Sequence, residues 1–250
     1  MMRRFSAPAL LPALLLSTAL GGCIHLLPSP PPPPRLYVLE VGEVPHAAAA
    51  PIDAVIAVSN PSGQRAVLGN EVIWRTGDTL AYVAQTQWSG RAEDGLQALL
   101  TQTLARQGRF KAAVQSGGAR ADYEIRWDIS NFEVIDNAGA MTAHFAANVS
   151  VVESFGRRVL AAQNFTAEAP VADRSSSAAT QALTRAARDA SNQISTFTGD
   201  TVATAIAQAQ AEAAAHAAEL GRTTQAETPS APRPVHRRSV RRSTSRAQHQ

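Results

Sequence analysis

The sequence predicts an α+β protein: a single two-layer domain with a mainly antiparallel sheet and two helices packed on one face, followed by a disordered C-terminal tail. Apolar and polar residues alternate over 123–130 and again over 141–152, which is typical of strands with one buried face. Apolar residues recur at three- and four-residue steps over 88–104 and again over 179–197, which is typical of amphipathic helices. The predicted domain, 35–200, is long enough to bury one core.

Residues 1–22 have the pattern of a secretory signal peptide. Arg3 and Arg4 precede an apolar run, and small residues close it. The run is too short to cross a hydrocarbon core of about 30 Å, and Pro8 and Pro12 interrupt it. We therefore expect a cleaved signal rather than a membrane span.

Leu20-Gly21-Gly22-Cys23 is similar to a bacterial lipobox, in which the cysteine sulfur receives a diacylglycerol. Cys23 is the only cysteine, so we expect lipidation there and no disulfide. Several acyl chains on one residue anchor a protein more firmly than a single chain. The next residue is Ile24, not the Asp that tends to retain Gram-negative lipoproteins at the inner membrane. We expect an outer-membrane protein whose body faces the periplasm.

A proline-rich spacer follows the cysteine over 23–34. The run 28–34 favours polyproline II at about 3.1 Å per residue, so it holds the domain roughly 20 Å from the lipid. Its position after the anchor favours a spacer over a ligand for a proline-binding domain.

The C-terminal tail, 221–250, carries most of the positive charge. It holds seven arginines against one acidic residue, Glu227, whereas residues 23–221 are net acidic. We expect the tail to be disordered. The basic pI of 9.6 therefore describes the tail and does not indicate nucleic-acid binding. Contact with anionic lipid or cell-wall polymer and a simple solvated extension both remain open for the tail.

Between spacer and tail, the first predicted elements are strands. Apolar residues over 36–41 and 54–58 predict two strands, and 72–75 with 79–83 predict a hairpin that turns at Thr76-Gly77-Asp78. A helix is expected to begin near Trp88, with Ser89 as its N-cap, and to end at Gly108.

Long antiparallel strands are expected next. The strand 110–114, the alternation over 123–130 and 141–152, and a last strand over 158–167 predict a meander with one apolar face. The final amphipathic helix, capped by Ser175 to Ser177, covers that face. Beyond Gly199, the Ala-rich run 201–220 predicts a weakly attached helical extension.

No sequence motif for catalysis is present. The chain lacks the Gly-x-Ser-x-Gly, His-Glu-x-x-His, Cys-x-x-Cys and P-loop patterns. His144 is the only histidine inside the domain outside a loop, and its place on a polar strand face indicates a solvated residue. The spacing of Asp122, Glu124 and Asp128 indicates a solvent-exposed face of the sheet. We expect no enzymatic activity, cofactor or metal, and nothing supports a periplasmic hydrolase.

The order of these elements resembles the ABC-type transport auxiliary lipoproteins, the PqiC-like family. The resemblance rests on the lipobox, the strand Leu36-Tyr37-Val38-Leu39, the aromatic hairpin 73–82 and the leucine-rich helix that follows Trp88, and it runs from Cys23 to Phe197. Asn60-Pro61-Ser62 departs from the more hydrophobic loop of the family, and the Arg-rich tail lies outside the resemblance.

The resemblance implies a non-catalytic auxiliary subunit of an MCE-type ABC transport system. Its partners would be an inner-membrane MCE-domain protein with its permease and ATPase, and the system would move lipids or other hydrophobic molecules between the two membranes. Homo-oligomer formation stays open. The alternative is a structural lipoprotein that links the outer membrane to the cell wall.

Three aromatic residues in a short segment are candidates for partner binding. Trp74, Tyr82 and Trp88 lie on the predicted hairpin and the loop after it, and this is more aromatic surface than such a segment needs for packing. A core role for all three is the other interpretation, and for Trp127 a core role is expected.

Overall fold

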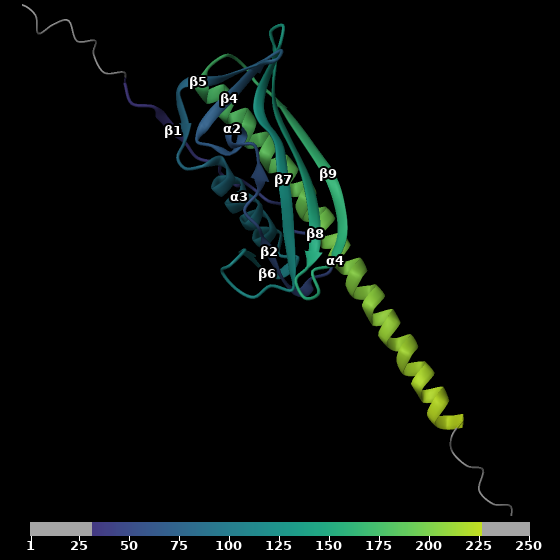
Figure 1. Cartoon of the computed structure of the whole chain (residues 1–250). Coiled ribbons are helices and arrows are strands. Elements are labelled where there is room, and N and C mark those ends of the chain that lie inside the picture. Colours follow the sequence, from purple (N-terminus) through teal and green to yellow (C-terminus); the bar gives the residue numbers. More distant parts are fainter. Residues whose placement is uncertain (1–31, 227–250) are drawn as a thin grey trace, which may run out of the picture. The chain divides into compact units, whose positions relative to one another are not determined.

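The computed structural model describes residues 32–226 (Figure 1). The predicted signal peptide 1–22, Cys23, the predicted spacer up to residue 31 and the predicted tail from 227 lie outside the described residues. The chain divides into two units, 1–199 and 200–250. The described residues of the first unit contain a nine-stranded mixed sheet, two whole helices and the first part of a third, and the unit is α+β as predicted.

Strand β7 (Tyr123–Asn137) organises the sheet. One of its edges pairs in turn with the strands β2 (Ile52–Val58), β3 (Ser62–Gly63) and β4 (Glu71–Thr76), all parallel to it. Its other edge pairs antiparallel with β8 (Ala140–Glu153), which pairs with β9 (Val159–Pro170). The outer positions are filled by β5 (Thr79–Trp88) on β4, β1 (Arg35–Tyr37) on β5, and β6 (Phe110–Gln115) on β2.

The prediction of a mainly antiparallel sheet is wrong. Five of the eight strand pairings are parallel, and the antiparallel ones are β4–β5, β7–β8 and β8–β9. The three antiparallel pairings join consecutive strands through short turns, which local sequence reveals. The parallel pairings join strands separated by helices, and an alternating pattern does not reveal them.

The hairpin and the meander are confirmed. β4 and β5 turn at Gly77, whose φ of 56° is left-handed, and β7 and β8 turn at Ala138 and Gly139 with φ of 52° and 99°. The core of the first unit lies on the inner face of β7 and β8, where apolar side chains alternate with polar ones. The buried set there includes Ile125, Trp127, Ile129, Phe145, Val149 and Val151.

Helix α3 (Ala92–Gln107) ends at Gly108 in the left-handed conformation, as predicted. Its N-cap is Arg91, not Ser89, because β5 continues through Trp88 and the amide of Ala92 donates to the carbonyl oxygen of Gly69 at 2.8 Å. A further short helix, α2 (Arg65–Leu68), was not expected.

Helix α4 (Ser176–Ala226) begins where predicted, with the amide of Ala178 donating to Ser175 Oγ at 3.1 Å. Figure 1 shows its first part crossing one face of β7, β8 and β9. Small residues make up most of its buried stripe, and Phe165 of β9 contacts Phe197 edge-on at 5.4 Å between ring centroids. The buried residues of this part are Ala179, Ala182, Leu183, Ala186, Ala187, Ala190 and Ile194.

The second unit contains the rest of α4, up to Ala226. The Ala-rich run 201–220 is helical, and its side chains are exposed from Ala207 to Leu220. The helix passes the predicted start of the tail at 221 by six residues, because Gly221 does not end it. No helix within residues 32–226 is long and apolar enough to cross a membrane.

Candidate partner-binding surface

The described residues show no constellation for catalysis. No group of three or more histidine, cysteine, aspartate and glutamate side chains within 32–226 could hold a metal ion. His144 Nε2 lies 3.9 Å from Glu168 Oε1, and within residues 32–226 no serine, threonine or cysteine side chain is hydrogen-bonded to either of them.

Strand β5 forms an open edge of the sheet. β1 pairs with β5 only at Thr86–Trp88, so residues 79–85 have no strand partner on their outer side within 32–226. β5 also bulges: Ile73 pairs with Tyr82 but Glu71 pairs with Gln87, and Gln85 in the bulge has a φ of 52°. An open edge presents backbone donors and acceptors to another chain.

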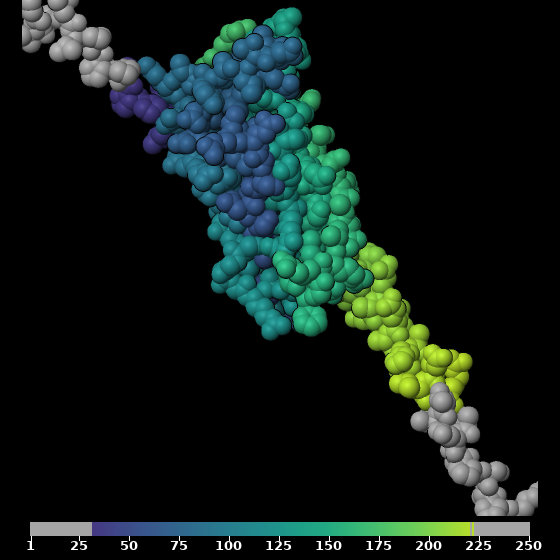
Figure 2. Space-filling model, viewed as in Figure 1, coloured from purple at the N-terminus to yellow at the C-terminus, as the bar shows by residue number. Residues whose placement is uncertain are grey.

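Large apolar side chains are exposed at both ends of this edge. We define the β1–β5 edge as Leu36, Val38, Leu80 and Tyr82, which are 62%, 61%, 49% and 61% exposed. They are four of the seven large hydrophobic side chains that are mostly exposed in the described chain. Figure 2 shows the blue part of the chain, which includes β4 and β5, beside the later strands in teal and green.

Tyr82 and Leu80 share one face of β5. Cross-strand partners lie on the same face, so these side chains stand beside Ile73 and Arg75. Arg75 Nη2 forms a 2.9 Å ion pair with Oε1 of the buried Glu133, which also accepts a hydrogen bond from Asn131 at 2.9 Å. The exposed apolar pair is thus bordered by a fixed ion pair. Sequence alone gives no signal for it because Arg75 and Glu133 are far apart in the chain.

Trp74 lies on the opposite face of the hairpin and is half-buried. The guanidinium carbon of Arg174 lies 5.9 Å from the centroid of its ring. Arg174 also forms a 2.5 Å ion pair with Asp136, and Asp136 Oδ1 accepts the amide of Gly139 at 2.9 Å. Trp74 therefore joins the β4–β5 hairpin to the β7–β8 turn and offers only part of its ring to a partner.

Trp88 belongs to the core. It is 4% exposed and stacks on Phe132, with ring centroids 5.6 Å apart and an interplanar angle of 21°. Its amide donates to the carbonyl oxygen of Asn70 at 2.7 Å, which holds it in the strand. This burial removes Trp88 from the surface available to a partner. Trp127 is likewise 4% exposed, as expected for a core residue.

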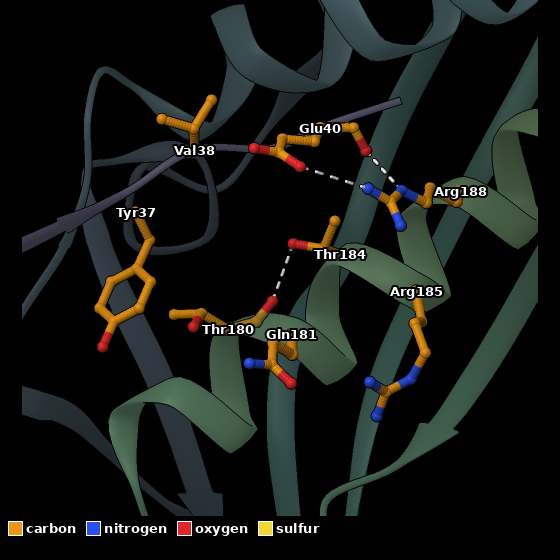
Figure 3. A pocket seen from close by; sticks show the side chains of 8 residues that line it. All are labelled: Tyr37, Val38, Glu40, Thr180, Gln181, Thr184, Arg185 and Arg188. Carbon is orange, nitrogen blue, oxygen red and sulfur yellow. Dashed lines mark hydrogen bonds and ion pairs between the residues drawn. The ribbon is translucent and has the colours of Figure 1, made fainter. Parts of the chain in front are cut away.

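A groove lies beside the β1–β5 edge, where the segment 37–40 runs next to α4 (Figure 3). Its volume is about 480 Å³, and Tyr37, Val38 and Glu40 face Thr180, Gln181, Thr184, Arg185 and Arg188 across it. Arg188 donates through Nε to the carbonyl oxygen of Glu40, and Arg185 donates to that of Pro170 at 2.9 Å. Two arginines and one glutamate give the groove a net positive charge.

The family model of the ABC-type transport auxiliary lipoprotein component matches residues 37–195. No match was found among curated proteins.

Solved structures that share the fold include the following two. Protein XCC0632 from Xanthomonas campestris, of family DUF330, is 22% identical with a TM-score of 0.64, and the match covers 68% of this chain and 97% of that one. An uncharacterized protein is 12% identical with a TM-score of 0.54, and that match covers 66% and 99%. At these identities the likeness concerns the fold.

Proposed function

Because the chain belongs to the ABC-type transport auxiliary lipoprotein family, we propose that it is the non-catalytic auxiliary subunit of an MCE-type system. In this proposal, Cys23 carries the lipid that anchors the chain in the outer membrane, with the body in the periplasm. An inner-membrane MCE-domain protein, with its ABC permease and ATPase, is the partner. The system moves lipids or other hydrophobic molecules between the two membranes, driven by the ATPase.

The proposal rests mainly on the exposed, partly unpaired β1–β5 edge. A subunit without chemistry of its own acts through its contacts, and an unpaired strand beside exposed apolar side chains fits strand addition by a partner. Tyr82 and Leu80 would supply the apolar contact, while the backbone of residues 79–85 would supply hydrogen bonds. Tyrosine is enriched among the residues that dominate interface energies.

The groove of Figure 3 adds a preference for an acidic partner segment. Arg188 donates to the backbone carbonyl of Glu40 and also pairs with the Glu40 carboxylate at 3.9 Å. Arg185 uses part of its guanidinium group on the carbonyl of Pro170, and its remaining N–H donors suit a carboxylate that follows the apolar contact along an extended chain. Trp74 contributes at most its exposed side.

Outer-membrane attachment rests on residues outside the described part. Ile24 follows Cys23, and the spacer 23–34 spans at most about 40 Å when fully extended. The first strand begins at Arg35, so this spacer keeps the start of the folded unit within about 40 Å of the anchor. A body held near one membrane is placed to receive a partner that reaches across the periplasm.

Co-purification with the MCE-domain protein tests the proposal. The double variant Leu80→Ser, Tyr82→Ser should lose the partner while keeping the melting temperature of the parent chain. Leu220→Ser is the matched control, since Leu220 is 55% exposed in the helical extension. Equal recovery of the MCE protein with the double variant and the control would contradict docking on this edge. Failure of the parent chain to recover it would contradict the proposed partnership.

A further inference from the structure

The turn between β8 and β9 displays the most exposed large hydrophobic residue of the described chain. Phe155 is 84% exposed, and Val159 at the start of β9 is 58% exposed. The turn is fixed: Glu153 N donates to the carbonyl oxygen of Arg158 at 2.8 Å, and Ser154 N donates to that of Asp122 at 2.9 Å. Phe155 is therefore held out on a closed turn, and little entropy is lost when it is bound.

The charges around Phe155 leave two cations without an ion pair. Arg120, in the adjacent loop, and Arg157 form none within residues 32–226, and both are exposed. The nearby acidic groups are engaged. Glu153 pairs with Arg158 at 3.3 Å, and Asp122 Oδ2 accepts the amide of Val55 at 2.8 Å. The turn thus presents an exposed phenyl ring together with two arginines that have no ion pair within residues 32–226: Arg120 lines the same surface hollow as Phe155, and Arg157 lies two residues further along the turn.

The anchor lets this turn reach the membrane. The strand register places β1 level with Glu71 of β4 and with Asn131 of β7. Tyr123, which pairs with Glu153 beside the turn, lies eight residues before Asn131. The distance along the strand from the level of β1 to the turn is therefore roughly 27 Å. The predicted spacer 23–34 spans at most about 40 Å. The chain that leaves Arg35 is long enough for the turn to lie on the bilayer that holds Cys23.

We propose that the β8–β9 turn is a second membrane contact, with Phe155 in the headgroup–acyl boundary and Arg120 and Arg157 on phosphate groups of anionic phospholipid. The contact would fix how the lipidated body lies on its membrane. It rests on the lipid anchor of the proposed function, but not on the MCE partner.

A lipid surface suits this turn better than a protein partner. Stable protein interfaces bury on the order of 1,200 Å² or more, whereas the apolar part of this turn consists of two side chains. An acylated chain needs only a modest second signal, such as an apolar side chain with a few cations, to hold a stable position.

The test uses the mature lipidated chain, whose only native cysteine, Cys23, carries lipid on its sulfur, so that an introduced cysteine is the only free thiol. An environment-sensitive dye is attached at Ser154→Cys, next to Phe155, and in a second chain at Asp78→Cys on the exposed β4–β5 turn as the matched control. Phosphatidylcholine vesicles with or without phosphatidylglycerol carry a quencher in the acyl region. Quenching reports insertion of the labelled turn, which binding of the Arg-rich tail alone would not produce.

We expect quenching at position 154 and not at 78, in vesicles that contain phosphatidylglycerol. Phe155→Ser should abolish the quenching. Arg157→Gln should lower the affinity of the turn for vesicles that contain phosphatidylglycerol about fivefold. Absence of quenching at 154, equal quenching at both positions, or no effect of Phe155→Ser would overturn the proposal. A dye response only to added MCE-domain protein would assign the turn to a protein contact and also overturn it. Co-purification with the MCE protein is measured separately, so failure here leaves that proposal standing.

Discussion

The guanidinium group of Arg174 lies over the ring of Trp74, 5.9 Å from its centroid, while it forms a 2.5 Å ion pair with Asp136. One side chain from the segment before α4 thereby joins the tips of the two hairpins β4–β5 and β7–β8. Because Trp74 packs against this cation on one side and is half-buried, one face of its ring supports the fold and the rest of the ring is exposed to solvent.

Trp74→Ala should cost about 2 kcal/mol of unfolding free energy, roughly half of the cost for a fully buried tryptophan. Urea unfolding of the single variants, Arg174→Ala and the double variant gives a thermodynamic cycle. We expect a coupling of about 0.5–1 kcal/mol, typical of a partly exposed cation–π pair. Strictly additive losses would show that the contact contributes nothing.

Trp88→Ala should destabilise the fold by about 3–5 kcal/mol, because its ring is buried against Phe132. Tyr82→Ala is the matched control, and as an exposed substitution it should change stability by no more than about 0.5 kcal/mol. Similar urea midpoints for the two variants would contradict the assignment of Trp88 to the core.

Gly199→Ala should destabilise the protein even though Gly199 lies inside a helix, where alanine is normally favoured by about 1 kcal/mol. A Cβ atom at this position would lie 2.5 Å from Arg109 Nη1 and 2.6 Å from Arg109 Cδ. Displacing the buried Arg109 should cost about 1–3 kcal/mol. A raised melting temperature would mean that Arg109 moves aside without loss.

Ionisation of the Tyr123 hydroxyl should lower the stability of the fold at alkaline pH. Burial first, and the charge of Glu153 second, raise the pKa of its hydroxyl above the ordinary value of 10.0. The folded state therefore holds this proton more tightly than the unfolded state, so the contribution is complete below the unfolded pKa and is lost as pH rises through the folded one. Tyr123→Phe should flatten the fall of the melting temperature above pH 10.0. An unchanged slope would exclude this group as a cause.

Cys23→Ser should yield an unprocessed chain without lipid, since no other thiol can accept it. Metabolic labelling with radioactive palmitate should mark the parent chain only. Equal labelling of both chains would refute the lipobox interpretation.

Local patterns in the sequence predicted the elements that depend on neighbours in the chain. Gly77 and Gly139 marked the two hairpin turns, Gly108 ended α3, and the stripe from Ala179 to Phe197 defined the packed part of α4. Each of these features is set by backbone conformation or by periodicity within a few residues.

The arrangement around β7 could not be predicted in this way. Its parallel pairings with β2, β3 and β4 join distant segments, and their register depends on how α2 and α3 pack. The exposure of aromatic residues has the same origin. Trp88 and Phe155 are both large and apolar, yet one is 4% and the other 84% exposed, because only one has a neighbouring strand and an aromatic partner across it.

Site-specific photo-crosslinking in the living bacterium tests the central claim most directly. A photoreactive amino acid replaces Tyr82 on the open edge, and in a control chain it replaces Glu168, whose side chain is 66% exposed on β9 at the opposite edge of the sheet. The proposed function predicts a crosslink from position 82 to an MCE-domain protein and none from position 168. Crosslinks from position 82 only to peptidoglycan-bound proteins, or the same products from both positions, would contradict it.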